Sequence, residues 1–285
     1  MSGDGVREIV LVDCPDEVGL IHRITGVLQA LRLNIDTNHE YVDHPQRWFF
    51  FRAEVTPSAV PVAAADLERF LAAALPAGAT VRVTREARRR IVVCATREPH
   101  CLGELLLGAS CGDLPVTIAA VVANHDDLRP LVERFGVPFE HVPHEGLARE
   151  AHEEALQGAV MRHAPESVVL ARYMRVLSAA AIAALPARMI NIHHSFLPAF
   201  VGANPYRQAF ERGVKLIGAT AHFVTEELDA GPIIAQDVIP VSHADTPAGM
   251  ARAGRDLEKL VLARAVRMVA EERVFIHGRR TVVFG

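Results

Sequence analysis

Hydrophobic positions in the first 85 residues follow two periods. Ile9 to Val12 form an unbroken apolar run of strand length, and Leu20 to Leu31 carry apolar residues three and four positions apart, which is the period of a helix. Four further elements follow in the order strand, strand, helix, strand, at residues 33–36, 47–55, 67–75 and 80–84. The resulting order β-α-β-β-α-β predicts a ferredoxin-like domain.

Beyond residue 90 the pattern changes to apolar runs that alternate with amphipathic segments. Buried strands are expected at residues 91–95, 116–122, 168–170 and 189–192. The helices expected between them lie at residues 126–135, 147–162 and 178–184. Strands that alternate with helices predict an open, mostly parallel α/β sheet. Ligands of such sheets bind at the carboxyl ends of the strands.

The C-terminal third adds three elements. A hairpin is expected around the turn Asp229–Pro232, then a long amphipathic helix, then a terminal hairpin; these elements span residues 216–241, 246–272 and 274–284. The charged run Arg85–Arg90 reads as a solvated linker. We therefore expect an α/β protein with two domains, residues 1–85 and 86–285.

Composition narrows the functional classes. The 285-residue chain has a formal net charge of −4, whereas nucleic-acid-binding domains usually carry a basic surface. The chain shows neither a basic segment followed by an apolar stretch nor an apolar run long enough to span a bilayer, so no secretory signal or membrane partner is expected. The four cysteines form no C-x-x-C pair, which predicts reduced thiols. We expect a cytoplasmic protein.

Two polar residues at the end of one expected strand are the first candidates for chemistry. Asn191 and His193 lie two positions apart, and side chains two apart on a strand face the same side. An amide and an imidazole at the end of a buried strand are costly unless they are satisfied, so we favour a functional role. The alternatives are that Asn191 caps the next turn and that His193 is a hydrogen-bonded core histidine.

Metal and nucleotide chemistry find no support in the spacing of the residues. His193, His194, His222 and Asp229 are of metal-ligating types, but no H-E-x-x-H motif joins them. No G-x-G-x-x-G and no P-loop occurs, and Ser195 lacks the G-x-S-x-G elbow of a serine hydrolase. We expect no metal and no nucleotide cofactor.

Several segments together resemble the folate-dependent formyltransferase superfamily. These are Ala171–Ser178, Asn191–Pro198, Gly218–Val224 and Leu228–Ile234. In that superfamily the catalytic set is the asparagine and the histidine of the N-I-H motif, with the aspartate that precedes A-G. The resemblance therefore implies that Asn191, His193 and Asp229 are catalytic.

A closer resemblance is to the formyltetrahydrofolate deformylase family. It is carried by His194 after His193, where the transferases commonly have proline, and by Asn124–Asp126 and Phe135–Phe139. That family has an N-terminal ACT domain, and Asp16–Leu20 resembles the loop-to-helix junction of that domain. The resemblance covers nearly the whole chain. It implies hydrolysis of 10-formyltetrahydrofolate to formate and tetrahydrofolate, in one-carbon and purine metabolism, with the folate as substrate and no cofactor.

The same resemblance implies where ligands bind. The folate pocket is expected to contain Met174, Arg175, Val176, Leu177, His194 and Gly202. Core packing is the alternative for the three apolar residues, and pairing with a surface carboxylate is the alternative for the arginine. An amino-acid effector of the ACT-like domain is expected at Asp16, Gly19 and Asn34. Because such domains usually pair between subunits, we expect a homo-oligomer.

Two other functions compete with hydrolysis. Formyl transfer to an amine such as glycinamide ribonucleotide needs a cradle of backbone N–H groups for the phosphate. The loop Thr96–Gly103 has one late glycine, the acidic Glu98, and Pro99, which has no N–H to donate. The second competitor, an amino-acid-sensing binding protein, is disfavoured because the implied catalytic set is intact.

Overall fold

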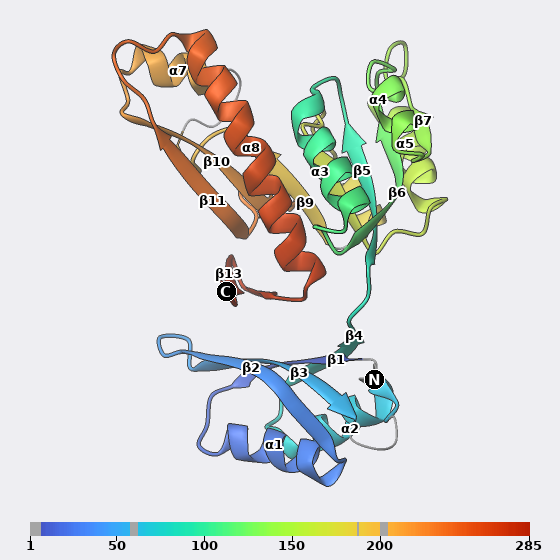
Figure 1. Ribbon diagram of the computed structural model, residues 1–285, viewed down its shortest axis with the longest axis vertical. Helices are drawn as coiled ribbons and strands as arrows, with labels where there is room; N and C mark the ends of the chain where they lie inside the picture. The colour runs from blue at the N-terminus through green and yellow to red at the C-terminus, as the bar shows by residue number, and fades with distance from the viewer. Residues whose placement is uncertain (1–6, 58–61, 187, 200–204) are drawn as a thin grey trace. The chain divides into compact units, whose positions relative to one another are not determined.

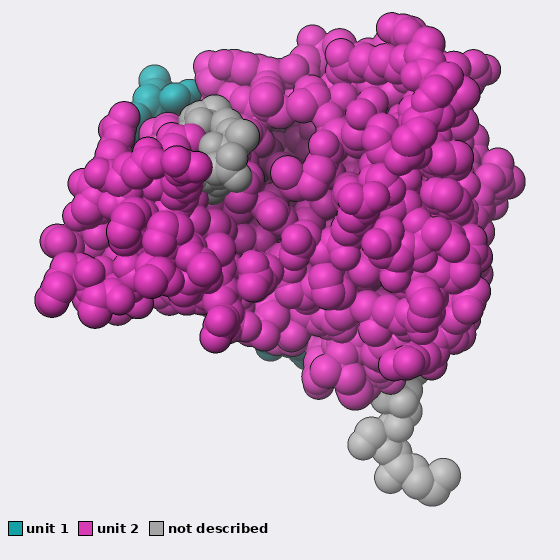
Figure 2. Space-filling model, turned by 90° about the horizontal axis from the view of Figure 1, so that it is seen from above, with its two compact units in different colours: residues 1–87, 284–285 teal, residues 88–283 magenta. Residues whose placement is uncertain are grey.

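The computed structural model describes all residues except 1–6, 58–61, 187 and 200–204. The chain divides into two compact units, residues 1–87 with Phe284–Gly285 and residues Arg88–Val283 (Figure 1, Figure 2). Each unit has its own sheet and its own buried core.

The first unit has the predicted ferredoxin-like order. Its elements are β1 (Glu8–Pro15), α1 (Leu20–Ala30), β2 (Leu33–Asp43), β3 (Trp48–Pro57), α2 (Ala64–Ala74) and β4 (Thr80–Arg85). The strands form an antiparallel sheet in the order β2-β3-β1-β4. Both helices cover one face of this sheet (Figure 1). The β-α-β-β-α-β prediction is confirmed.

The core of the first unit lies between the sheet and its helices. Phe49 and Phe51 of β3 share this core with Leu28 of α1 and Leu71 of α2. Strand β2 continues to Asp43, past the expected end at residue 36. The expectation was too short because β2 is an edge strand, and most of its positions beyond Ile35 are polar and partly or fully exposed. Its apolar signal is therefore weak.

The second unit is built on a seven-stranded sheet. Its elements are β5 (Arg89–Ala95), α3 (Pro99–Cys111), β6 (Val116–Ala123), α4 (Arg129–Arg134), β7 (Phe139–His141), α5 (Arg149–Met161), β8 (Ser167–Ala171), α6 (Ala179–Ala184), β9 (Met189–His193), α7 (Pro205–Glu211), β10 (Leu216–Phe223), β11 (Ile233–Pro240), α8 (Pro247–Ala270), β12 (Val274–His277) and β13 (Arg280–Val283). The sheet order is β11-β10-β9-β8-β5-β6-β7. The strands from β9 to β7 are parallel, and β10 runs antiparallel to both of its neighbours, β9 and β11.

Both faces of this sheet are buried, which explains the unbroken apolar runs of its strands. Val93 of β5 packs in a core with residues of α3 and α8, whereas its neighbours Val92 and Cys94 pack in a second core with residues of α5 and α6. The mostly parallel α/β sheet is as predicted. Among the described residues, no helix combines the length and the apolar character needed to cross a bilayer.

Two expectations from the sequence need correction. Helix α3 is absent from the prediction because glycines at 103 and 108 and the exposed Leu107 interrupt its apolar face. The linker is shorter than Arg85–Arg90, since Arg85 ends β4 and Arg89 begins β5. Arg89 is not a solvated linker residue, because it pairs with Glu166 at 3.1 Å and with Glu272 at 3.3 Å.

Candidate active site

Two neighbouring strands carry most of the candidate catalytic side chains. In the antiparallel register of β9 and β10, Asn191 lies opposite His222 and His193 lies opposite Thr220. Asn191, His193 and His222 all line one pocket, as the two-residue spacing predicts for the first two. His193 is only 5% exposed.

Asp229 approaches these residues from the loop between β10 and β11. Its backbone has a φ of 55°, a left-handed conformation that aspartate adopts more readily than most residues. The loop passes close to β10 at Gly231, where a Cβ would lie 1.7 Å from the carbonyl oxygen of Phe223. Only glycine fits this position, so the backbone fixes where the carboxylate lies.

The carboxylate of Asp229 lies between two imidazoles. Its Oδ2 is 3.2 Å from His193 Nδ1, and its Oδ1 is 3.6 Å from His222 Nε2. Burial on its own would raise the pKa of Asp229, but the interactions with His193 and His222 outweigh it and hold the pKa well below the usual carboxyl range. Asp229 is therefore ionised at neutral pH.

His222 orients the amide of Asn191. His222 Nδ1 lies 2.8 Å from the carbonyl oxygen of Phe223, so Nδ1 carries a hydrogen and donates it. His222 Nε2 lies 3.2 Å from Asn191 Nδ2 and 3.6 Å from Asp229 Oδ1, so it faces both residues. Sequence reasoning gave His222 no role of this kind. The signal that could have found it is the β9–β10 register, which sets it opposite Asn191.

His193 has one engaged ring nitrogen and one free one. Nδ1 faces Asp229, while Nε2 is buried and has no hydrogen-bond partner in the part of the chain that is described. A buried nitrogen without a partner costs about 1–3 kcal/mol. A ligand atom that pairs with Nε2 recovers this cost, so the site is prepared to hold a polar group of a ligand there.

Thr220 fixes the loop that follows β9. Its hydroxyl donates to the carbonyl oxygen of Ser195 at 2.8 Å and accepts from the backbone N–H of Leu197 at 3.1 Å. Gln236 of β11 donates to the same hydroxyl at 2.9 Å and to the carbonyl oxygen of Leu197 at 3.0 Å. These bonds hold the segment after His193 against β10.

The pocket around these groups has a volume of about 730 Å³, within the range of about 300–1,000 Å³ that is usual for small-molecule sites. Met174 and Val176 line it and are 57% and 59% exposed, so core packing does not explain them. Leu177 lines the pocket as well but belongs to the core beneath it. Arg175 also lines it, and no carboxylate pairs with it among the described residues. Gly202 lies outside the described residues.

His194 also lines the pocket. Its ring centroid is 5.1 Å from that of His193 and 6.2 Å from that of Tyr206. Burial, the positive charge of Arg172 and the neighbouring His193 lower the pKa of His194 to about 4. His194 is therefore a neutral imidazole at physiological pH, beside a histidine whose carboxylate partner is ionised.

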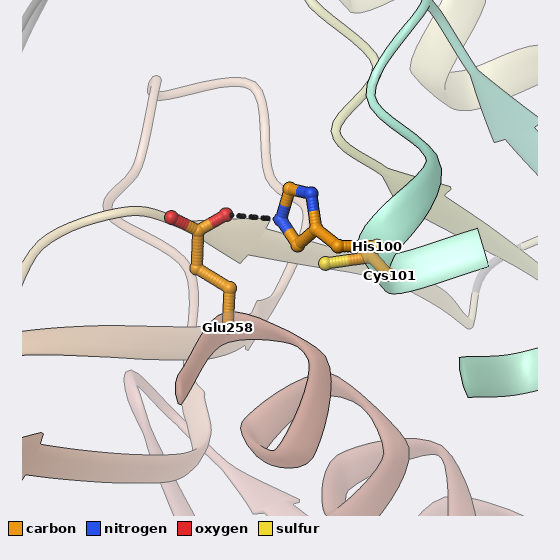
Figure 3. Close-up of side chains that lie close together, drawn as sticks. All are labelled: His100, Cys101 and Glu258. Carbon is orange, nitrogen blue, oxygen red and sulfur yellow. Dashed lines mark hydrogen bonds and ion pairs between the residues drawn. The ribbon is translucent and has the colours of Figure 1, made fainter. Parts of the chain in front are cut away.

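Two groups of side chains have metal-ligating types. His100, Cys101 and Glu258 lie together beside the pocket, with His100 Nε2 2.8 Å from a Glu258 oxygen (Figure 3). Burial and the charge of Glu258 raise the pKa of the Cys101 thiol well above its usual value, and Arg172 lies 3.4 Å from Glu258. A protonated thiol and an adjacent cation favour a hydrogen-bonded network over a cation site.

The second group consists of His125, His144 and Glu145. Its two Nδ1 atoms face donors, because Arg97 lies 3.2 Å from that of His125 and Asn124 lies 3.3 Å from that of His144. Hydrogen bonds thus account for both nitrogens.

The predicted effector residues lie in the first unit. Asp16 and Gly19 belong to the loop before α1, where Gly19 has a φ of 92° and precedes the first helical residue. Asn34 lies on the edge strand β2 and donates to Asp36 at 2.8 Å. The positive φ thus explains why residue 19 is a glycine, and the hydrogen bond to Asp36 gives Asn34 a local structural role.

Comparisons with known proteins agree with this architecture. Residues 89–266 match the formyl transferase family and residues 9–71 match the ACT domain family. A formyltetrahydrofolate deformylase of Escherichia coli strain K12 is 52% identical, over 97% of this chain and 98% of that protein. The crystal structure of a formyltetrahydrofolate deformylase from Pseudomonas syringae is 42% identical, with a TM-score of 0.94 over 99% of this chain and 96% of that one.

Solved structures of related transferases cover a smaller share of this chain. A glycinamide ribonucleotide transformylase from Symbiobacterium toebii is 35% identical, with a TM-score of 0.67 over 70% of this chain and 95% of that one. The fold and the pocket thus define a folate-dependent formyl transferase domain that carries an ACT domain. The chain belongs to the formyltetrahydrofolate deformylase family.

Proposed function

We propose that the chain hydrolyses 10-formyltetrahydrofolate to formate and tetrahydrofolate. The observation that carries this proposal is His193, whose Nδ1 faces the ionised Asp229 while its buried Nε2 has no partner among the described residues. A ring held in this way can donate from Nε2 to the formyl oxygen. The relatives that match nearly the whole chain support the same reaction.

In the proposed mechanism, Asn191 and a protonated His193 stabilise the oxyanion. Water attacks the formyl carbon, and the negative charge that develops on the formyl oxygen receives hydrogen bonds from Asn191 Nδ2 and His193 Nε2. Donors that already point at the position of the oxyanion need no reorganisation during the reaction. Removing one such donor typically raises the activation free energy by about 2.7–4 kcal/mol. His222 supports this role because it fixes the Asn191 amide.

Asp229, whose Oδ2 lies 3.2 Å from His193 Nδ1, receives the proton of the water in the proposed step. A carboxylate with such a low pKa is a weak base toward free water. The attacking oxygen becomes strongly acidic as it bonds to carbon, however, and a weak base then suffices. The bond between N10 and carbon breaks, and N10 takes up a proton from the His193–Asp229 pair. One water is consumed, formate and one proton are released, and no cofactor is required.

The folate lies along the remaining wall of the pocket in this proposal. Met174 and Val176 present apolar surface to the pterin, with Leu177 beneath them and His194 beside the formyl group. Arg175, which has no carboxylate partner among the described residues, suits the glutamate tail because a guanidinium matches a carboxylate bidentately. Gly202 keeps its predicted substrate-binding role only as an expectation.

Water is favoured over an amine as the acceptor. The loop that follows β5 begins helix α3 with Pro99, and Glu98 lines the pocket before it. An acidic side chain there repels a phosphate, and proline offers it no N–H. Formyl transfer to a phosphorylated amine is therefore disfavoured, despite the similarity of the second unit to the transformylases.

Turnover of 10-formyltetrahydrofolate by the full-length protein tests the proposal, with tetrahydrofolate followed by absorbance and formate quantified in parallel. We expect equal amounts of the two products without any amine, and no stimulation by glycinamide ribonucleotide. Formate-free turnover that requires the amine would identify a transferase.

For the ACT domain we propose an amino-acid effector that binds near Asp16, Gly19 and Asn34 in a homo-oligomer. The exposed apolar Val18, which lies between Asp16 and Gly19, supports this location. Equilibrium dialysis with glycine and with methionine, combined with light scattering for the subunit number, tests it. Binding that disappears in Asn34→Ala is expected, and a monomer without amino-acid affinity contradicts the proposal.

A further inference from the structure

Arg172 lies at the catalytic end of the pocket. It follows directly after β8, whose parallel register with β9 pairs Leu170 with Asn191. Two residues further along both strands, Arg172 reaches the same edge of the sheet as His193. Arg172 lines the pocket, and its charge acts on His194. The guanidinium therefore belongs to the end of the pocket where the formyl group reacts.

The pairing of this guanidinium is incomplete. Its side chain is only 13% exposed, yet its single ion-pair contact within the described ranges is Glu258, at 3.4 Å from Nε. No hydrogen bond from the guanidinium is found there, and Nε is buried without a hydrogen-bond partner. The backbone of Arg172 also has a φ of 59°, a conformation that non-glycine residues rarely adopt. A strained and nearly buried cation thus keeps unused donors in the pocket.

Glu258 is committed to other partners and does not complete the pairing. It is fully buried, and one of its oxygens receives a hydrogen bond from His100 at 2.8 Å (Figure 3). The other oxygen receives one from Tyr206 at 2.5 Å. Tyr206 comes close because residue 254 is glycine, where a Cβ would lie 2.1 Å from the tyrosine hydroxyl. The network fixes the carboxylate in place, and each of its oxygens already accepts one hydrogen bond. The donors of Arg172 are left for a ligand.

We propose that Arg172 forms a subsite for a small carboxylate, which in the reaction is the product formate. Five N–H donors in a fixed plane match the two oxygens of a carboxylate. The neutral His194 beside it adds no competing charge. The identity of the carboxylate rests on the proposed function, since hydrolysis produces formate at His193. In this subsite the guanidinium receives formate as the bond between carbon and N10 breaks.

The subsite is tested without turnover, by titrating the full-length protein with ¹³C-formate and following its NMR line broadening. We expect saturable binding to the wild type and a loss of affinity of about tenfold or more in Arg172→Met, from the usual strength of hydrogen bonds to charged groups. Arg172→Lys keeps the charge without the planar fork and is expected to lie between the two. Arg255→Met, at another arginine of the same pocket, is the matched control and is expected to lose less than Arg172→Met.

Glu258→Gln gives a prediction of opposite sign. Removing the buried negative charge leaves Arg172 less neutralised, so formate is expected to bind more tightly than to the wild type. A role of Arg172 that is only structural would move neither titration in these directions. If Glu258→Gln does not fold, the formate titrations of Arg172→Met and Arg172→Lys still test the subsite.

Any of the following titration results overturns the subsite: no saturable formate binding by the wild type, equal binding by Arg172→Met, or equal losses in Arg172→Met and Arg255→Met. Displacement of formate by p-aminobenzoylglutamate from the wild type would assign Arg172 to the folate tail, and it would also overturn the proposal. Failure of the proposed function is separate, because it appears as absent hydrolysis while the titration needs no substrate.

Discussion

Asp229→Asn tests the proposed mechanism at the residue whose carboxylate faces both His193 and His222. The substitution preserves the shape of the side chain but removes a negative charge 3.2 Å from His193 Nδ1 and 3.6 Å from His222 Nε2. Opposite unit charges about 4 Å apart interact by about 4 kcal/mol at an effective dielectric constant of about 20, which corresponds to about a 10³-fold change in rate. A general base contributes about 10²–10⁴-fold. We expect kcat to fall by about 10³-fold.

The assay is steady-state release of formate, with substrate affinity measured separately by fluorescence quenching. Affinity is expected to change little, because the proposed mechanism places Asp229 at the formyl group and the pterin against Met174 and Val176. Glu227→Gln is the matched control, since Glu227 lies two residues earlier in the same loop and pairs with Arg279 at the surface. A kcat of Asp229→Asn near that of the control would refute the role of the carboxylate.

The pH dependence of turnover gives a second test of the ionised state of Asp229. A carboxyl group whose pKa is lowered in the folded state contributes above its unfolded pKa and loses that contribution as the pH falls through the folded value. The pKa of Asp229 lies well below the usual range, so the residue stays ionised between about pH 5 and pH 8. The carboxyl group of Asp229 is therefore expected to add no titration step of its own to wild-type kcat over that interval. A fall of wild-type kcat toward pH 5 that is missing in Asp229→Asn would show that Asp229 titrates there.

Three further predictions concern the groups around Asp229. His193→Ala is expected to lower kcat by about 10²–10³-fold through loss of one oxyanion donor, and turnover within threefold of the wild type would remove that role. Thr220→Val leaves the Leu197 N–H without a partner and is expected to reduce the free energy of unfolding by about 1–3 kcal/mol, measured in urea; an unchanged midpoint would contradict the loop support. His194, with a pKa of about 4, takes up its proton in the unfolded state first, so stability falls as the pH drops from about 6.5 to 4. His194→Gln should flatten that slope, and an unaltered slope would refute the burial of a neutral imidazole.

Local patterns were sufficient for most of the elements but not for the whole site. The two-residue spacing on a buried strand predicted that Asn191 and His193 act together, because strand geometry links positions that are near in sequence. Asp229 lies in a turn that no period reveals, and only the family resemblance implied it. The edge strand β2 and helix α3 were misjudged because their apolar faces are interrupted.

The rest of the site depends on tertiary packing. His222 orients Asn191 through the register of two antiparallel strands, which requires the pairing itself to be known. The bond between Tyr206 and Glu258 joins residues 52 positions apart, on helices α7 and α8. It exists because Gly254 lets the two helices approach. A single glycine in a long helix gives no such information in the sequence.

The most direct measurement of the central claim is hydrolysis of 10-formyltetrahydrofolate in H₂¹⁸O, with the formate analysed by mass spectrometry after a single turnover. The account predicts one ¹⁸O atom in each formate from the wild type, without any added amine, and almost none released by Asp229→Asn in the same time. Formate without the label, or no formate until an amine is supplied, would contradict it.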